Sequence, residues 1–203
     1  MPILQKHQLR VAAVAKIVCD SCSEETDDYE IITACLLHDM GNIIKFDLSF
    51  FPEFLEPEGE QYWRAVRTDF LKKYGDNEHE ATVMIAKEIG VSERVIVLIN
   101  AIGFSQIPKA YESNDLSVKI AAYADSRVTP HGVTDLEGRL REGRERYKNH
   151  FKKKPKEDSF YEEMIEIFKK VESQIFENVP IYPEDINDSP VNTELGGLEN
   201  WGV

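Results

Sequence analysis

Helix start and stop signals recur along the whole chain, whereas the apolar–polar alternation typical of strands is almost absent. Near the N-terminus, four apolar residues and one histidine recur at steps of three and four, which places them on one face of an amphipathic helix: Leu4, His7, Val11, Val14 and Val18. We call this set the first stripe. Capping residues and glycines delimit the other expected helices, at about residues 29–37, 58–75, 77–90, 93–102, 115–125, 134–149 and 159–176. We therefore predict an all-α fold, with residues 103–114 as a loop.

The chain has 203 residues, enough for one domain with a real hydrophobic core and no need of disulfides. We expect a single helical domain over residues 1–176, whose added C-terminal helices lie within residues 134–176. Residues 177–203 contain three prolines and a Gly-Gly pair, so we expect an irregular acidic C-terminal tail.

The net charge of −13 argues against a nucleic-acid partner, because phosphate contacts supply most non-specific affinity for nucleic acid. No apolar stretch approaches the ~20 residues of a membrane span, and the N-terminus lacks the apolar core of a signal peptide, so we expect a cytoplasmic protein. One segment runs against the overall charge: residues 139–156, from Arg139 to Lys156, hold nine Lys or Arg and two Glu. This basic run could face a phosphate ligand or an acidic partner, or could be a solvated helix face.

Three cysteines form an odd set with no disulfide framework, and Cys19 and Cys22 make a C-x-x-C pair. We interpret the pair as structural, and keep a redox protein built on it as an alternative.

Ionisable residues sit on apolar faces of several expected helices. His7 lies in the first stripe, His38 follows Ala34 by four residues, and Asp125 follows Ala121 by four. Asp39 comes directly after His38, and His79 shares a face with apolar residues of its own helix. A buried carboxylate costs several kcal/mol unless it is paired, hydrogen-bonded or bound to a cation. One divalent metal would satisfy two Asp and two His together.

The order His7, then His38-Asp39, then Asp125 resembles the H…HD…D signature of the HD-domain metal-dependent phosphohydrolases. The resemblance covers residues 3–130, and two further segments carry it, Leu36–Asn42 and Glu78–Ile96. It implies a helical bundle around a divalent metal with four ligands: His7, His38, Asp39 and Asp125.

Two departures from relatives favour a mononuclear site, for Mn, Mg, Fe, Co, Ni or Zn. The dinuclear phosphodiesterases of this superfamily carry further histidines where residues 98–104 have none. Its di-iron oxygenases need six protein ligands, and this chain offers five candidates when His79 is included. The position that is often Lys in the family is Asn42, and Lys45 could replace that cation.

The resemblance implies that a metal-activated water attacks a phosphoester or phosphoanhydride. Lys45, Arg127 and Arg10 are the candidates for substrate binding, because cations stabilise the charge of the transition state. His79 could be an acid/base, an outer hydrogen-bonding partner, a ligand to a second metal or a core residue. Asp47 could protonate the leaving oxygen, as the nucleotidase branch implies, or cap a loop. Finally, His131 is expected at the surface, and His150, beside the basic run, suggests no specific role.

The first hypothesis is a hydrolase that acts on a small nucleotide or nucleotide-like phosphoester. Residues 125–130 are loosely similar to the branch that cleaves symmetrical dinucleoside polyphosphates. The alternative is a non-catalytic HD-fold module that senses a nucleotide or a metal. Either leaves open whether the chain forms a homo-oligomer.

Overall fold

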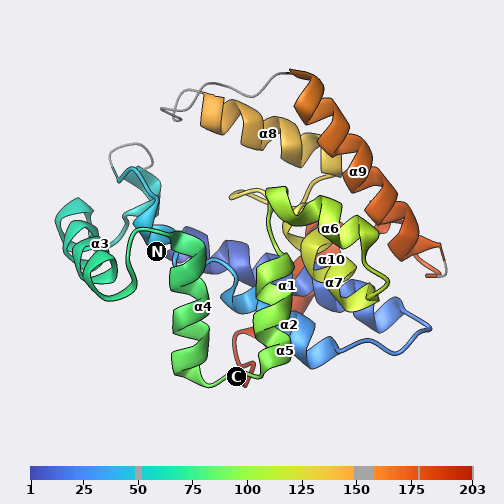
Figure 1. The fold of residues 1–203 in the computed structure, drawn as a ribbon, viewed down its shortest axis with the longest axis horizontal. Helices are drawn as coiled ribbons and strands as arrows, with labels where there is room; N and C mark the ends of the chain where they lie inside the picture. Colours follow the sequence, from blue (N-terminus) through green and yellow to red (C-terminus); the bar gives the residue numbers. More distant parts are fainter. Residues whose placement is uncertain (49–51, 149–157, 178, 203) are drawn as a thin grey trace.

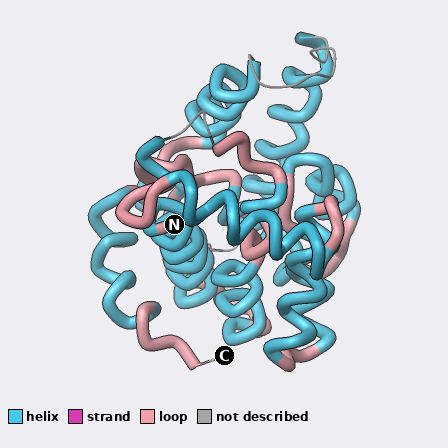
Figure 2. Tube along the Cα trace, turned by 90° about the vertical axis from the view of Figure 1, so that its left-hand side faces the viewer, coloured by secondary structure: helices cyan, strands magenta, loops and turns pink. Residues whose placement is uncertain are grey.

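The structure, a computed structural model, describes residues 1–48, 52–148, 158–177 and 179–202. Helices dominate this part of the chain in both views, and its only strand-like pairing is an isolated bridge between Val128 and Val133 (Figures 1 and 2). The predicted all-α fold is therefore confirmed. The helices are α1 (Pro2–Ser21), α2 (Asp28–Leu37), α3 (Glu60–Tyr74), α4 (Glu78–Ile89), α5 (Glu93–Ala101), α6 (Ile107–Glu112), α7 (Leu116–Asp125), α8 (Leu136–Lys148), α9 (Asp158–Phe176) and α10 (Asp188–Leu198).

The core forms around α1, which packs against α2, α7 and α10. Residues 11–15 of this helix are fully buried, and three of the five are alanine, so neighbouring helices can approach its backbone closely. Helix α2 packs in turn on α5 and α7, and α9 covers α6 and α7. The ends of α2 and α7 and the first turns of α1 carry the residues with the metal-ligand pattern, so this packing decides where those residues meet.

Capping side chains begin the helices where the sequence predicts them. Asn77 accepts hydrogen bonds from the backbone of residues 79 and 80, Ser92 accepts one from Val95, and Asp115 accepts two at the start of α7. Gly90 ends α4 in the left-handed conformation with φ of 91°, which a glycine adopts without strain.

Two expectations about irregular segments are wrong. Residues 103–114, expected as a loop, contain a short 3₁₀ turn and α6, because Pro108 sits in the first turn of that helix, where a missing N–H costs nothing. The tail, expected to be irregular, forms α10 over Asp188–Leu198. Pro190 lies in the first turn of this helix, where a missing N–H costs nothing, and Val191 and Leu198 are buried in the main core, so packing on α1 overrides the low helix propensity of the two glycines.

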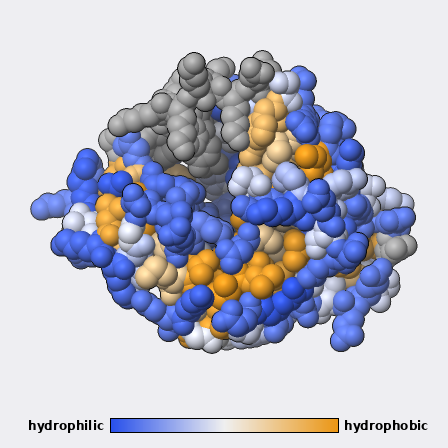
Figure 3. Space-filling view, viewed as in Figure 1, coloured by the Kyte–Doolittle hydropathy of each residue, from blue (hydrophilic) through white to orange (hydrophobic). Residues whose placement is uncertain are grey.

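No described helix is long and apolar enough to cross a membrane. Apolar side chains gather on one face over α4 and α5, where Met84, Ile89 and Val97 are among the exposed large apolar residues (Figure 3).

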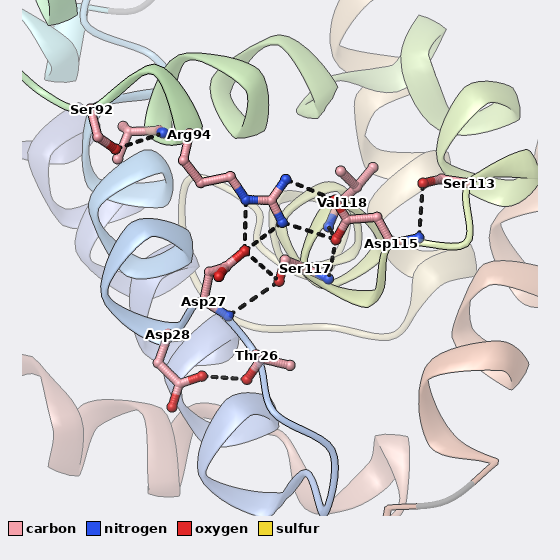
Figure 4. A network of polar contacts seen from close by, with 10 residues as sticks. Thr26, Asp27, Asp28, Ser92, Arg94, Ser113, Asp115, Ser117 and Val118 are labelled. Atoms are coloured by element: carbon pink, nitrogen blue, oxygen red, sulfur yellow. Dashed lines mark hydrogen bonds and ion pairs between the residues drawn. The ribbon is translucent and has the colours of Figure 1, made fainter.

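Arg94 joins three elements in a polar network (Figure 4). Its guanidinium donates to both carboxylate oxygens of Asp115, at 2.7 and 3.0 Å, and to Asp27 at 2.6 Å. The Ser117 hydroxyl completes the network by accepting from the backbone of Asp27. Asp115 begins α7 and Asp27 precedes α2, so Arg94 of α5 ties together the starts of the two helices that end at the candidate ligands.

We expect Arg94→Ala to lower the free energy of unfolding by about 1–2 kcal/mol at pH 7, because a bidentate, networked pair exceeds an isolated surface pair. Arg94 lowers the pKa of Asp115, so the stabilisation is present above the carboxyl's unfolded pKa of about 3.9 and is lost as pH falls below it. Urea unfolding should show the wild-type advantage shrinking between pH 7 and pH 3. Arg64→Ala, which removes an exposed pair with Glu60 on α3, should cost less than about 0.5 kcal/mol. A similar loss for both variants would contradict the role of the network.

Candidate metal centre

Four ionisable side chains come together from three segments. His7 projects from α1, His38 and Asp39 follow the end of α2, and Asp125 is the last residue of α7. Both imidazoles are buried, with 8% and 7% of each residue exposed. The helices that carry these residues form the core of the fold, so their backbone positions are fixed by packing rather than by loops.

The distances between these side chains suit a single ion. The Nε2 atom of His7 lies 3.2 Å from Asp125 Oδ1 and 3.8 Å from Asp39 Oδ2. The Nε2 atom of His38 lies 3.5 Å and 3.6 Å from the same two oxygens. Two ligands held at about 2.0–2.2 Å from one metal are themselves about 3–4 Å apart. His7, His38 and Asp39 each offer a ligand atom within 4.8 Å of the others, and Asp125 contacts both histidines.

The tautomer of His38 fits metal binding. Its Nδ1 lies 2.7 Å from the carbonyl oxygen of Cys35, so Nδ1 carries the proton and donates. Its Nε2 is buried, faces the two carboxylates and has no hydrogen-bond partner among the described residues. A carbonyl that fixes the outer nitrogen of a histidine is the usual support for a metal-binding inner nitrogen.

The electrostatics of the metal-free cluster point the same way. Burial alone would lower the pKa of His38, but the carboxylates of Asp39 and Asp125 raise it to about 9. Burial opposes the ionisation of Asp39 and Asp125, yet the neighbouring imidazoles hold the pKa of both carboxyls below the usual range. The site therefore holds two carboxylates and needs a positive charge, which a proton or a metal ion can supply.

Metal binding should strengthen as pH rises. Below about pH 9 an ion must displace the proton of His38, so each pH unit should change the apparent affinity by about tenfold, with about one proton released. Titration calorimetry with Mn²⁺ at pH 6.5, 7.5 and 8.5, in buffers of different protonation enthalpy, measures both quantities. An affinity that is constant over this range would contradict the proposed ligand role of His38.

Gly41 allows the turn that follows α2, which contains His38 and Asp39, to pack against α4. Its backbone N–H donates to the Thr82 hydroxyl at 2.9 Å, and a Cβ atom at this position would lie 2.1 Å from the Glu78 carbonyl oxygen. Only glycine allows this approach, which places the first turn of α4, including His79, beside the metal-ligand cluster.

A cavity of about 600 Å³ opens over the cluster. Its lining comes from α1, the residues between α2 and α3, α4, the segment between α5 and α6, the end of α7 with the loop that follows it, and α8. The lining residues are Leu4, His7, His38, Asp39, Asn42, Lys45, Phe46, Phe54, Glu78, His79, Thr82, Ile102, Gly103, Phe104, Ser105, Gln106, Asp125, Pro130 and Arg139. Such a volume suits a small organic ligand.

Two of the residues expected to touch substrate or take part in catalysis line this cavity. Lys45 does so with its ammonium 3.7 Å from a Glu78 carboxylate oxygen. His79 also lines it, with Nε2 2.9 Å from the side-chain oxygen of Asn100. His79 does not belong to the group of close metal-ligand atoms formed by His7, His38 and Asp39. Its imidazole is hydrogen-bonded to Asn100 and is part of the cavity wall.

Three other expected residues do not line the cavity. Arg127 is 3% exposed and is held by the C-terminal part of the chain, donating to the carbonyls of Thr134, Pro183 and Ile186. This position does not support the prediction that Arg127 binds substrate. Arg10 is also buried, and its guanidinium donates to the carbonyl of Pro130 at 3.2 Å; Pro130 lines the cavity, whereas Arg10 does not. Asp47 is exposed and lies outside that lining.

Sequence reasoning missed part of the cavity wall. Phe104, Ser105 and Gln106 belong to a segment expected to be a plain loop, and no motif distinguishes them. For Arg139 the sequence indicates only that it begins the basic run, not that it lines a cavity. Residues 149–156 of that run, with His150, lie outside the described part of the chain.

The cysteines do not favour the redox alternative. Cys19 and Cys35 are buried and Cys22 is partly buried, and burial raises the pKa of all three thiols. The thiolate is the reactive form, so these side chains are poor nucleophiles. His131 is exposed, as expected.

Comparison with known proteins supports one assignment. The family model of the HD domain matches residues 4–128, which include His7, the His38-Asp39 pair and Asp125. Searches of curated proteins and of solved structures find no significant match. With more than half of its length matched, the chain belongs to the HD domain family.

Proposed function

We propose that this protein is a divalent-metal-dependent phosphohydrolase that cleaves a phosphoester or phosphoanhydride of a small, nucleotide-like substrate. One observation carries the proposal: the Nε2 atoms of two imidazoles lie 3.2–3.8 Å from the oxygens of two carboxylates, beneath a cavity whose lining includes the side chains of Lys45 and Arg139. The HD family consists mostly of metal-dependent hydrolases, which agrees with this arrangement.

His7, His38, Asp39 and Asp125 would hold one ion. A bound divalent ion lowers the pKa of a coordinated water towards roughly 7 and polarises a phosphoryl oxygen. In this proposal the four ligands fix the position at which the phosphoryl group reacts. Mn, Mg, Fe, Co, Ni and Zn all remain candidates, since imidazole and carboxylate ligands suit several of them. A single ion is favoured because His79, the fifth candidate ligand, contacts Asn100.

The remaining lining residues would bind and orient the substrate. Lys45 would hold a phosphoryl oxygen, and the Asn100 contact orients the His79 imidazole so that it can exchange a proton with the leaving oxygen or the attacking water. Phe46, Phe54 and Phe104 supply an apolar part of the wall, which suits the base of a nucleotide-like molecule. The net charge of −13 favours a small-molecule substrate over nucleic acid.

The second candidate is a sensing module that binds the same ligands without turnover. Asn42 favours it: this residue is buried and lines the cavity at a position where the family often carries a cation. The absence of that cation would weaken stabilisation of the transition state more than it weakens binding of the ligand.

A substrate panel separates the two candidates. The full chain, loaded with each of the six metals in turn, would be incubated with mononucleotides, dinucleoside polyphosphates and simple phosphoesters. We expect phosphate or nucleotide release from at least one substrate, with no release in the presence of a chelator. Saturable binding without release would support the sensor, and absence of both would contradict a phosphohydrolase.

A further inference from the structure

Helix α8 adds a wall to the cavity from outside the part of the chain that matches the HD family. The family model ends at residue 128, whereas α8 spans Leu136–Lys148 and contributes Arg139 to the lining. Helix α9 holds α8 in place: the Arg144 guanidinium lies 5.0 Å from the Tyr161 ring centroid, and Lys169 pairs with Glu137 at 2.7 Å. Both helices lie at one end of the molecule in Figure 1.

The guanidinium of Arg139 has hydrogen-bonding capacity to spare. Its side chain is 18% exposed, its Nε is buried, and that atom has no hydrogen-bond partner among the described residues. Nη1 reaches a Glu142 oxygen only at 3.5 Å, the limit of a hydrogen bond. Arginine carries five N–H donors, and a buried donor without an acceptor costs free energy. A ligand with several acceptor oxygens would remove that cost.

The next turn of α8 leaves room for this guanidinium. At Gly143 a Cβ atom would lie 3.0 Å from Arg139 Nη1, closer than ordinary contact. Glycine within a helix is destabilising by up to about 1 kcal/mol relative to alanine. A larger residue at this position would require the flexible Arg139 side chain to shift slightly, so Gly143 is compatible with the observed position of the guanidinium.

Charge in the cavity distinguishes Arg139 from Lys45. Lys45 pairs with Glu78, a carboxylate of the same lining, whereas the carboxylate next to Arg139 belongs to Glu142, outside the lining. Arg139 also helps to lower the pKa of Asp125, so its charge acts close to the ligand cluster, yet among the described residues no ion pair joins it to a carboxylate of the lining.

We propose that Arg139 binds the anionic phosphoryl group of the substrate, so that α8 of the C-terminal extension completes the active site. Guanidinium and phosphate match in a bidentate geometry that an ammonium cannot reproduce. This inference rests on the proposed phosphohydrolase function and names the residue and the helix that confer affinity for the anion.

The test measures binding of inorganic phosphate, used as the probe of the phosphoryl site, to the Mn²⁺-loaded full chain by titration calorimetry. Arg139→Ala should weaken phosphate binding about 10- to 150-fold, the range for a charge-assisted hydrogen bond, with unchanged Mn²⁺ content. Arg139→Lys should recover only part of the affinity. The matched control is Arg141→Ala, which removes the same charge from an exposed position of α8 and should stay within twofold of wild type.

The failures of the two proposals are distinguishable. If wild-type protein binds Mn²⁺ and phosphate, and the Ala and Lys variants both bind phosphate within twofold of it, the Arg139 assignment is wrong while the phosphohydrolase remains. If Arg139→Ala loses helicity or metal, the Lys variant decides alone, because it keeps the charge and the side-chain length. If Mn²⁺-loaded wild-type protein binds no phosphate and hydrolyses nothing in the panel, both proposals fall.

Discussion

Asp39→Asn should lose the bound metal, and with it the proposed hydrolase activity, while it keeps the helical fold. The substitution preserves shape but removes the negative charge that lies 3.6 Å from His38 Nε2 and 3.8 Å from His7 Nε2. Loss of an outer hydrogen-bonding partner weakens metal affinity 10- to 100-fold in typical sites, so loss of a direct ligand should exceed about 100-fold. Elemental analysis after dialysis measures the metal, and far-ultraviolet circular dichroism measures the fold.

Asp47→Asn is the matched control for this substitution. Asp47 is exposed, lies eight residues after Asp39 and does not line the cavity. We expect it to keep metal content and turnover within twofold of wild type. An Asp39→Asn protein that retains stoichiometric metal would show that the HD dipeptide is not part of the metal site.

Arg127→Ala should give a large loss of stability in the C-terminal part of the fold. The guanidinium donates to the backbone carbonyls of Thr134, Pro183 and Ile186, and contacts Tyr123 and Glu172. Removing one partner of a buried ionic network costs about 3–5 kcal/mol, since the other polar groups stay buried without it. For a chain of this size that corresponds to roughly 6–20 °C in Tm.

Urea unfolding and thermal scans measure the Arg127 effect. Arg127→Lys should lie between wild type and the Ala variant, because an ammonium keeps the charge but cannot reach all five partners. Hydrogen exchange should quicken first in residues 183–198, which the guanidinium anchors. A loss below about 1 kcal/mol would show that Arg127 is not the link between α7 and the C-terminal segment.

Local signals explain how much of the fold was predictable. Caps such as Asn77, Ser92 and Asp115 act within one turn, so the sequence alone locates them. Helix α10 is not predicted because its stability comes from contact with α1, at the other end of the sequence, against the low helix propensity of Gly196 and Gly197. Helix α6 is only six residues long, too short for a periodic pattern to show.

In the candidate site, too, only some of the residues could be predicted from the sequence. The ligand residues could be found because apolar helix faces rarely carry His and Asp without a partner, and their order resembles a known signature. The cations could not be placed, because sequence distance from a ligand says little about direction. Arg127 is two residues from Asp125 but points away from the cavity, whereas Arg139 is fourteen residues from it and lines the cavity.

The most direct test is a crystal structure of the Mn²⁺-loaded protein with anomalous scattering measured at the manganese edge. We expect a single anomalous peak per chain, about 2.0–2.6 Å from Nε2 of His7 and His38 and from carboxylate oxygens of Asp39 and Asp125. Two peaks in the cavity, or one peak away from these four residues, would contradict a mononuclear centre built by the HD signature.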